Sequence, residues 1–136
     1  MFLPKTLKHK IMERHNSSSS PELLTYEQTE VIQELVNCAL ACDACSTACL
    51  SEKDVAMMTR CIALSRDCAE ICFQASRLIM RKSELSEHYL TLCEEACRLC
   101  AEECKKHKED HCEICSEACE NCADTCNRFY SHASEH

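Results

Sequence analysis

Along most of the chain, apolar residues and cysteines recur at steps of three and four, and polar or charged residues fill the positions between them. The segment HCEICSEACENCADTC shows the pattern most clearly, because its five cysteines follow one another at steps of 3, 4, 3 and 4. Such steps place all five side chains on one face of an α-helix. The pattern therefore predicts an amphipathic helix whose inner face carries thiols where an ordinary helix would carry leucine or valine.

Three earlier segments carry a similar stripe. The helices are expected over residues 25–50, about 54–80, from 83 or 86 to about 105, and from 110 onward, and the first opens with the capping-box pattern TYEQ. The connections LSEKD, RKSELS and KKHKED are short. Helices joined in this way fold up-down-up-down, so we expect an all-α protein, an antiparallel four-helix bundle with a cysteine-lined core.

The composition agrees with an almost wholly helical chain. Of the 136 residues, 16 are Cys, two are Pro and none is Gly. Without glycine, the chain has no Gly-rich phosphate loop and no dinucleotide-binding fingerprint. The formal net charge of −8 argues against nucleic acid as a partner.

The chain divides into three parts. Residues 1–24 form a basic N-terminal extension with a Ser-rich linker, for which a short extra helix and a loose tail both remain open; residues 25–131 form the bundle, and residues 132–136 a C-terminal tail. The start lacks an apolar run of signal-peptide length, because Pro4 directly follows Phe2 and Leu3. No stretch is apolar enough to span a membrane. We therefore predict a cytoplasmic protein with reduced thiols and no membrane partner.

The cysteines are the candidate functional residues. They are Cys38, Cys42, Cys45, Cys49, Cys61, Cys68, Cys72, Cys93, Cys97, Cys100, Cys104, Cys112, Cys115, Cys119, Cys122 and Cys126. Cysteine fills too little volume for a dry thiol core to pack well, so the interior is expected to hold something else. Thiolate is a soft ligand that favours Cu(I), zinc and iron–sulfur clusters.

Charge and geometry favour multiple Cu(I) ions. Four Zn²⁺ ions in Cys₄ sites would each leave a buried charge of −2, and the predicted inner faces offer no Lys or Arg to compensate it. A Cu⁺ ion that replaces each thiol proton keeps the interior neutral. Thiols at i and i+4 have Cβ atoms about 5–6 Å apart, which a nearly linear S–Cu–S unit of roughly 4.6 Å could bridge.

The two ends of the bundle are predicted to differ. The first and third connections lie at the same end and bring Met57, Met58, His107 and His111 there. Thioether and imidazole are plausible Cu(I) ligands, so this end is interpreted as the mouth through which copper passes. Apolar residues gather at the other end and are expected to close it, namely Val31, Leu35, Ile79, Leu90, Phe129 and Tyr130.

Residues 30–127 resemble the copper storage proteins, and the absence of an export signal resembles the cytosolic branch of that family. The motifs that carry the resemblance are the repeated CxxxCxxC, KHKEDHCEICSEACENCADTC and RCIALSRDCAEIC. The resemblance implies a homotetramer of four-helix bundles, Cu(I) bound by all 16 cysteines, and His107 and His111 at the opening. A copper chaperone is a possible partner. The N-terminal extension, Met57 and Met58 depart from the family pattern.

Three alternatives stay open. A zinc or general thiophilic-metal buffer would saturate near four Zn²⁺ ions per chain and hold them more tightly than copper. An iron–sulfur protein would be brown after anaerobic purification, although the ferredoxin spacing of cysteines is absent. A thiol redox enzyme would need one exposed cysteine of low pKa. Nothing in the stripes requires catalytic turnover, so we expect a protein that is not an enzyme.

Overall fold

The computed structural model describes residues 24–134 of the chain, with side chains described through residue 131. This part consists of four α-helices and one short 3-10 helix, and no strand occurs in it: α2 (Tyr26–Cys49), η1 (Val55–Met58), α3 (Thr59–Met80), α4 (Ser86–Cys104) and α5 (Asp110–Ser134). The prediction of an all-α fold is confirmed. The predicted extra N-terminal helix lies outside the described residues, and α5 continues into the segment predicted as a tail.

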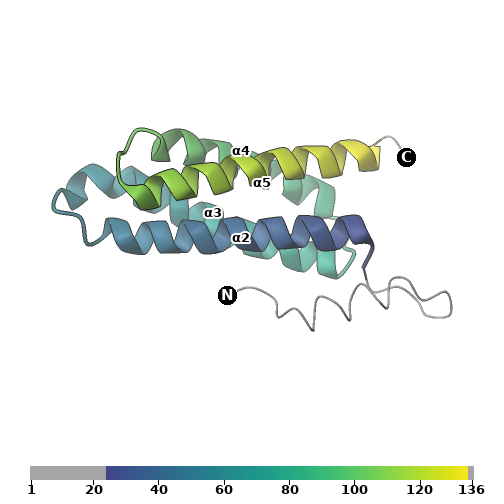
Figure 1. Cartoon of the computed structure of the whole chain (residues 1–136). Helices are drawn as coiled ribbons and strands as arrows, with labels where there is room; N and C mark the ends of the chain where they lie inside the picture. The colour runs from purple at the N-terminus through teal and green to yellow at the C-terminus, as the bar shows by residue number, and fades with distance from the viewer. Residues whose placement is uncertain (1–23, 135–136) are drawn as a thin grey trace.

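The four helices pack side by side as an antiparallel bundle (Figure 1). Each helix contacts two neighbours along its length, in the order α2, α3, α4, α5 and back to α2. The connections α2–α3 and α4–α5 lie together at one end of the bundle, and the α3–α4 connection lies at the other (Figure 1). The first and third connections therefore meet at one end, as predicted. No helix within the described range is both long and apolar enough to traverse a lipid bilayer.

Local sequence explains where the helices begin and end. The predicted capping box is present at the start of α2: the Gln28 N–H donates to Thr25 Oγ1 at 3.0 Å, and the Thr25 N–H donates to Gln28 Oε1 at 2.9 Å. Helix α3 ends in a Schellman motif, in which Ser83 N–H donates to Leu78 O and Lys82 N–H donates to Ile79 O. Lys82 has a positive φ of 54°, a conformation that glycine would adopt at lower cost.

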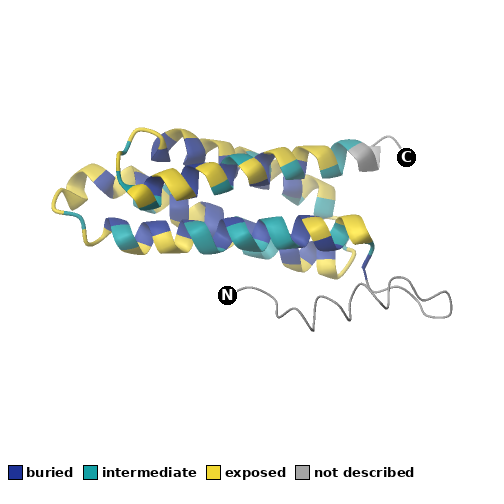
Figure 2. Ribbon diagram, viewed as in Figure 1, coloured by how far each residue is buried: buried dark blue, intermediate teal, exposed yellow. Residues whose placement is uncertain are grey.

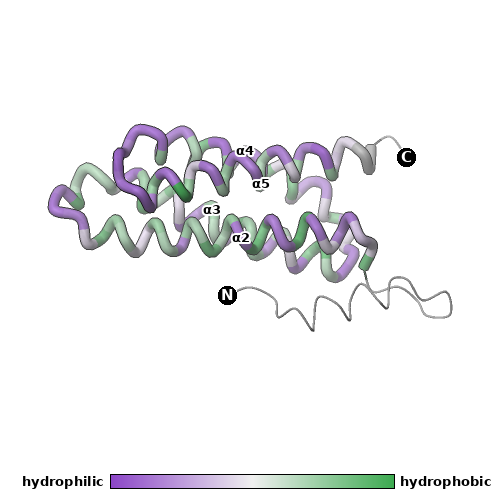
Figure 3. Tube along the Cα trace, in the orientation of Figure 1, coloured by the Kyte–Doolittle hydropathy of each residue, from purple (hydrophilic) through white to green (hydrophobic). Residues whose placement is uncertain are grey.

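Buried residues run along the inner side of every helix, while exposed residues cover the outside (Figure 2). Hydrophobic and hydrophilic residues alternate along each helix, and the α4–α5 connection is hydrophilic (Figure 3). All 16 cysteines have zero exposed area. The stripe pattern therefore identified the inner face of every helix.

One end of the bundle is closed by apolar side chains. Val31, Leu35, Ile79 and Leu90 are buried there, and Phe129 packs against them with partial exposure. Tyr130, which was also predicted to close this end, is partly buried and packs against the same core. Because these residues come from all four helices, the plug holds the bundle together at the end farthest from the α2–α3 and α4–α5 connections.

Candidate metal centre

The sulfur atoms form one continuous array along the bundle axis. All 16 cysteines are free thiols. Sulfur atoms from different helices approach to between 3.4 and 3.9 Å, as between Cys42 and Cys119 or Cys45 and Cys112. These separations far exceed the roughly 2.05 Å of a disulfide bond. The thiols therefore lie in contact without being cross-linked, as a reduced array requires.

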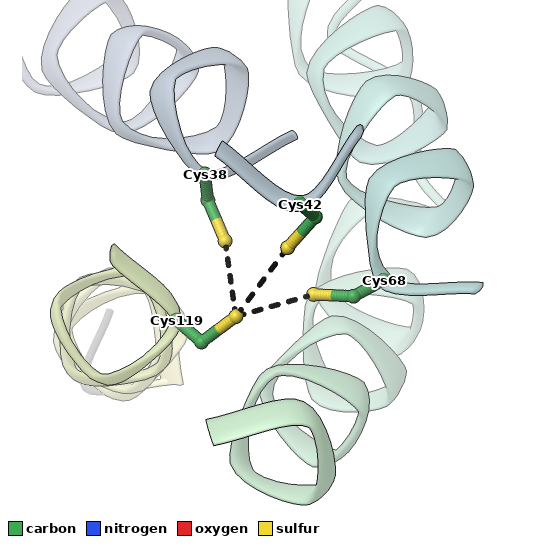
Figure 4. Close-up of side chains that lie close together, drawn as sticks. All are labelled: Cys38, Cys42, Cys68 and Cys119. Atoms are coloured by element: carbon green, nitrogen blue, oxygen red, sulfur yellow. Dashed lines mark hydrogen bonds between the residues drawn. The ribbon is translucent and has the colours of Figure 1, made fainter. Parts of the chain in front are cut away.

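A cluster in the middle of the bundle shows how the helices combine (Figure 4). Cys38 and Cys42 come from α2, Cys68 from α3 and Cys119 from α5. The Cys119 sulfur lies 3.4 Å from that of Cys42, 3.8 Å from Cys38 and 3.9 Å from Cys68. All four sulfurs lie within 4.8 Å of one another, close enough to surround a metal ion.

Other groups of thiols continue this cluster in both directions. Within 4.8 Å of one another lie the sulfurs of Cys38, Cys72, Cys97 and Cys122; of Cys42, Cys100, Cys115 and Cys119; of Cys45, Cys49, Cys61 and Cys112; and of Cys45, Cys104 and Cys115. Several cysteines belong to two groups. Shared members suit thiolates that bridge two metal ions, so the array is better described as connected clusters than as isolated sites.

No positive side chain compensates charge inside the array. Among the described residues, neither lysine nor arginine is buried. Burial, and the negative charge that Cys45 and Cys61 carry when ionised, raise the pKa of Cys49 above its usual value. Burial and the same neighbours also raise the pKa of Cys112. These thiols therefore keep their protons unless a cation takes the proton's place.

His111 lies at the mouth, in contact with the outermost sulfurs. Its Nδ1 atom is 3.6 Å from the sulfurs of Cys45 and Cys112 and 3.9 Å from that of Cys49. Its Nε2 atom is 3.0 Å from Glu52 Oε1. Burial lowers the pKa of His111, but the contacts with Cys45 and Glu52 outweigh burial and raise it overall.

His107 lies in a different environment at the same end. Its Nε2 atom is 2.9 Å from Oε2 of Glu103, a carboxylate that is only 6% exposed. The other oxygen of Glu103 lies 3.2 Å from Arg60 Nε and 3.5 Å from Lys106 Nζ. Burial raises the pKa of Glu103, but His107 and Lys106 outweigh burial and lower it overall. His107 thus contacts a carboxylate that Arg60 and Lys106 also approach, at the end where the sequence predicted the mouth.

The two methionines of the predicted mouth point in different directions. Met58 is 4% exposed and belongs to the core, whereas Met57 is 74% exposed. Both belong to η1, directly before α3. The structure therefore brings Met58 toward the array and leaves Met57 on the surface of the same end.

Ser65 is a lumen residue that the sequence analysis missed. It is fully buried in α3. Its hydroxyl oxygen lies 3.6 Å from the sulfur of Cys100, 3.8 Å from that of Cys115 and 4.0 Å from that of Cys104. The Ser65 hydroxyl is thus surrounded by sulfur atoms, in a position where a cysteine would add a seventeenth sulfur to the array. The acidic residues Glu52 and Glu103 were missed as well.

The fold and the site define a class of protein: a helical bundle that encloses a thiol array able to hold many soft metal ions. A family model described as copper storage protein matches residues 25–131. The chain belongs to the copper storage protein family.

Solved structures of related proteins agree with this assignment. The Cu(I)-bound copper storage protein BsCsp3 is 35% identical over 75% of this chain and 96% of its own, with a TM-score of 0.73. The copper storage protein Ccsp from Streptomyces lividans, loaded with 10 copper equivalents, is 29% identical over 91% of this chain and 98% of its own, with a TM-score of 0.80. A cytosolic copper storage protein from Streptomyces lividans with five coppers is 30% identical over 93% of this chain and 97% of its own, with a TM-score of 0.72. A search of curated proteins found no match.

Proposed function

We propose that this protein stores many Cu(I) ions in the cytoplasm, bound by the thiolates that line its bundle. The observation that carries the proposal is a continuous array of buried sulfurs with no buried cation beside it among the described residues. Capacity is about one ion per cysteine, roughly 16 to 20 per chain if thiolates bridge. Storage needs no catalytic step, so the protein is not an enzyme in this proposal.

Charge selects copper over zinc. A Cu⁺ ion that displaces one thiol proton leaves the net charge of the array unchanged, whereas a Zn²⁺ ion held by four thiolates leaves a charge of −2 in a low-dielectric interior. The four-thiol groups are large enough for tetrahedral zinc, but they offer no positive partner for that charge. Singly charged soft ions can therefore fill the array to capacity without building up charge.

The ligands in this proposal are the 16 cysteines and His111. Of the two predicted histidines, His111 is the one whose ring contacts sulfur atoms of the array. It therefore receives copper at the mouth. His107, Met57 and Met58 act around the mouth without entering the thiolate clusters. Each ion that moves inward releases a thiol proton, and shared cysteines pass it from one group to the next.

Assembly and delivery extend the proposal. A homotetramer follows from the family resemblance, and the partly exposed Ile62, Ile71 and Phe73 on α3 offer apolar area for it. A copper chaperone that hands Cu(I) to the mouth would suit a cell that keeps free copper scarce. The relative from Streptomyces lividans described as cytosolic supports the cytoplasmic location proposed for this chain.

Anaerobic titration of the reduced protein with Cu(I), in competition with a chromophoric Cu(I) chelator, tests the function. We expect saturation at roughly 16 to 20 ions per chain. A parallel titration with Zn²⁺ should saturate lower and yield to Cu(I). Tighter retention of zinc, or a brown iron-containing protein after anaerobic purification, would contradict copper storage.

A further inference from the structure

The two ring nitrogens of His111 face different partners. Nε2 contacts the Glu52 carboxylate at 3.0 Å, and Nδ1 faces the sulfurs of Cys45, Cys49 and Cys112 at 3.6 to 3.9 Å. An ionised carboxylate can only accept a hydrogen bond, so the Nε2 atom must carry hydrogen and donate it to Glu52. In the neutral imidazole, the lone pair then lies on Nδ1, on the side of the sulfurs.

Glu52 is held where it can set this orientation. It lies in the connection after α2, and its N–H donates to Cys49 O at 3.2 Å, which ties its backbone to the helix that carries two of the three sulfurs. His111 stands in the first turn of α5. The Glu52–His111 pair therefore spans the two connections that surround the mouth and fixes the ring between them.

We propose that Glu52 is a positioning residue for copper uptake. It holds the His111 ring with Nδ1 above Cys45 and Cys112, so that an arriving Cu(I) ion meets one nitrogen and two sulfurs at the surface of the array. Carboxylates that accept from the second nitrogen of a histidine orient many metal-binding histidines in this way, and their loss typically weakens metal affinity or activity about 10- to 100-fold. The inference rests on the proposed function and adds a residue that determines the rate of loading.

Glu103 beside His107 has a different role. Its carboxylate contacts the His107 ring and forms ion pairs with Arg60 and Lys106, the two cations on the rim beside it. Glu52 contacts His111 at the array itself. Of the two histidine–carboxylate pairs, the pair formed by Glu52 is thus the one placed to present a nitrogen to the sulfurs.

The test compares the full-length reduced protein with Glu52→Ala, Glu52→Gln and Glu113→Ala. Glu113 lies exposed in the first turn of α5. Its replacement by alanine removes one negative charge from this end of the bundle and leaves the Glu52–His111 contact in place. Stopped-flow transfer of Cu(I) from a chromophoric chelator gives the loading rate, and a full titration gives the capacity. In the copper-free protein, ¹⁵N NMR of the His111 ring reports which nitrogen carries the hydrogen.

We expect Glu52→Ala to load about tenfold more slowly at unchanged capacity, with a His111 spectrum shifted from the Nε2–H form to a mixture. Glu52→Gln should recover most of the rate, because its amide oxygen still accepts from Nε2, and Glu113→Ala should behave as wild type. Equal slowing by Glu113→Ala would show charge attraction and overturn the proposal, as would an unaltered rate and spectrum in Glu52→Ala. A lower capacity in Glu52→Ala would make Glu52 a ligand and also overturn it. If wild type takes up no Cu(I), the storage function fails, while the ¹⁵N spectra still decide whether Glu52 orients His111.

Discussion

Replacing Ser65 with cysteine should add one donor to the copper store. The Ser65 hydroxyl lies 3.6 to 4.0 Å from the sulfurs of Cys100, Cys104 and Cys115, nearly the range that separates sulfurs elsewhere in the array. A sulfur at this position would therefore touch three existing ligands. Oxygen of a neutral hydroxyl is a poor Cu(I) ligand, so the wild-type position contributes no binding capacity. With about one ion per thiolate, Ser65→Cys should raise saturation by one Cu(I) per chain.

The assay is the anaerobic chelator-competition titration, run beside a thiol count on denatured protein that should rise by one from 16. Cys68→Ser, which makes the reverse change in the same helix, is the matched control and should lower saturation by one ion. Ser65→Ala should leave saturation unchanged. An unchanged capacity in Ser65→Cys with all thiols reduced would refute the reasoning, and a loss of one ion in Ser65→Ala would show that the hydroxyl is itself a ligand.

Three further variants test the fold around the store. Leu35→Ala removes a fully buried side chain from the apolar plug, so it should destabilise the copper-free protein by about 2–5 kcal/mol in urea unfolding without changing copper capacity. Lys82→Gly should stabilise the protein by about 1 kcal/mol, visible as a higher Tm, because glycine adopts the positive φ at lower cost. Burial raises the pKa of Glu94, but hydrogen bonds from Tyr130 and two other side chains outweigh it, so the pKa is lowered overall. The stability that ionised Glu94 contributes is therefore fully present above the ordinary pKa of a glutamate, and it is lost as pH falls through the lowered pKa of the folded protein. Glu94→Gln should lower the free energy of unfolding by about 1–3 kcal/mol at pH 7, and in acid it should unfold with the same free energy as wild type.

The helices could be predicted because one physical signal repeats through each of them. Steps of three and four fixed the inner face of each helix. Helix α2 was predicted over 25–50 and α4 from 83 or 86 to about 105, and both observed helices end within about one residue of those bounds, with α4 beginning at the second of its two predicted starts. The second helix was predicted to start near residue 54, where the structure has η1 before α3 begins at Thr59. That difference arises because a 3-10 turn carries the same short-range pattern as the first turn of an α-helix.

The lumen residues outside the cysteine pattern were harder to predict. Ser65 stands in the stripe of α3 between Cys61 and Cys68, which are seven residues apart, so the signal was present but was overlooked in favour of the thiols. Glu52 gave no such signal, because its role depends on the approach of His111 from a helix 59 residues further along the chain. The grouping of sulfurs likewise depends on how the helices are rotated and shifted along their axes, which periodicity within one helix does not determine.

Sulfur spacing bears on how the ions are held. The sequence favoured linear S–Cu–S units along one helix, which need sulfurs roughly 4.6 Å apart if each bond is about 2.3 Å. The i, i+4 pairs Cys45/Cys49, Cys68/Cys72 and Cys100/Cys104 instead lie 3.9 Å apart. Three-coordinate copper at the same bond length needs sulfurs roughly 4.0 Å apart, which these pairs meet with almost no movement. The thiols are therefore already spaced for bridged clusters, in which each ion takes a third sulfur from a neighbouring helix and each thiolate serves more than one ion.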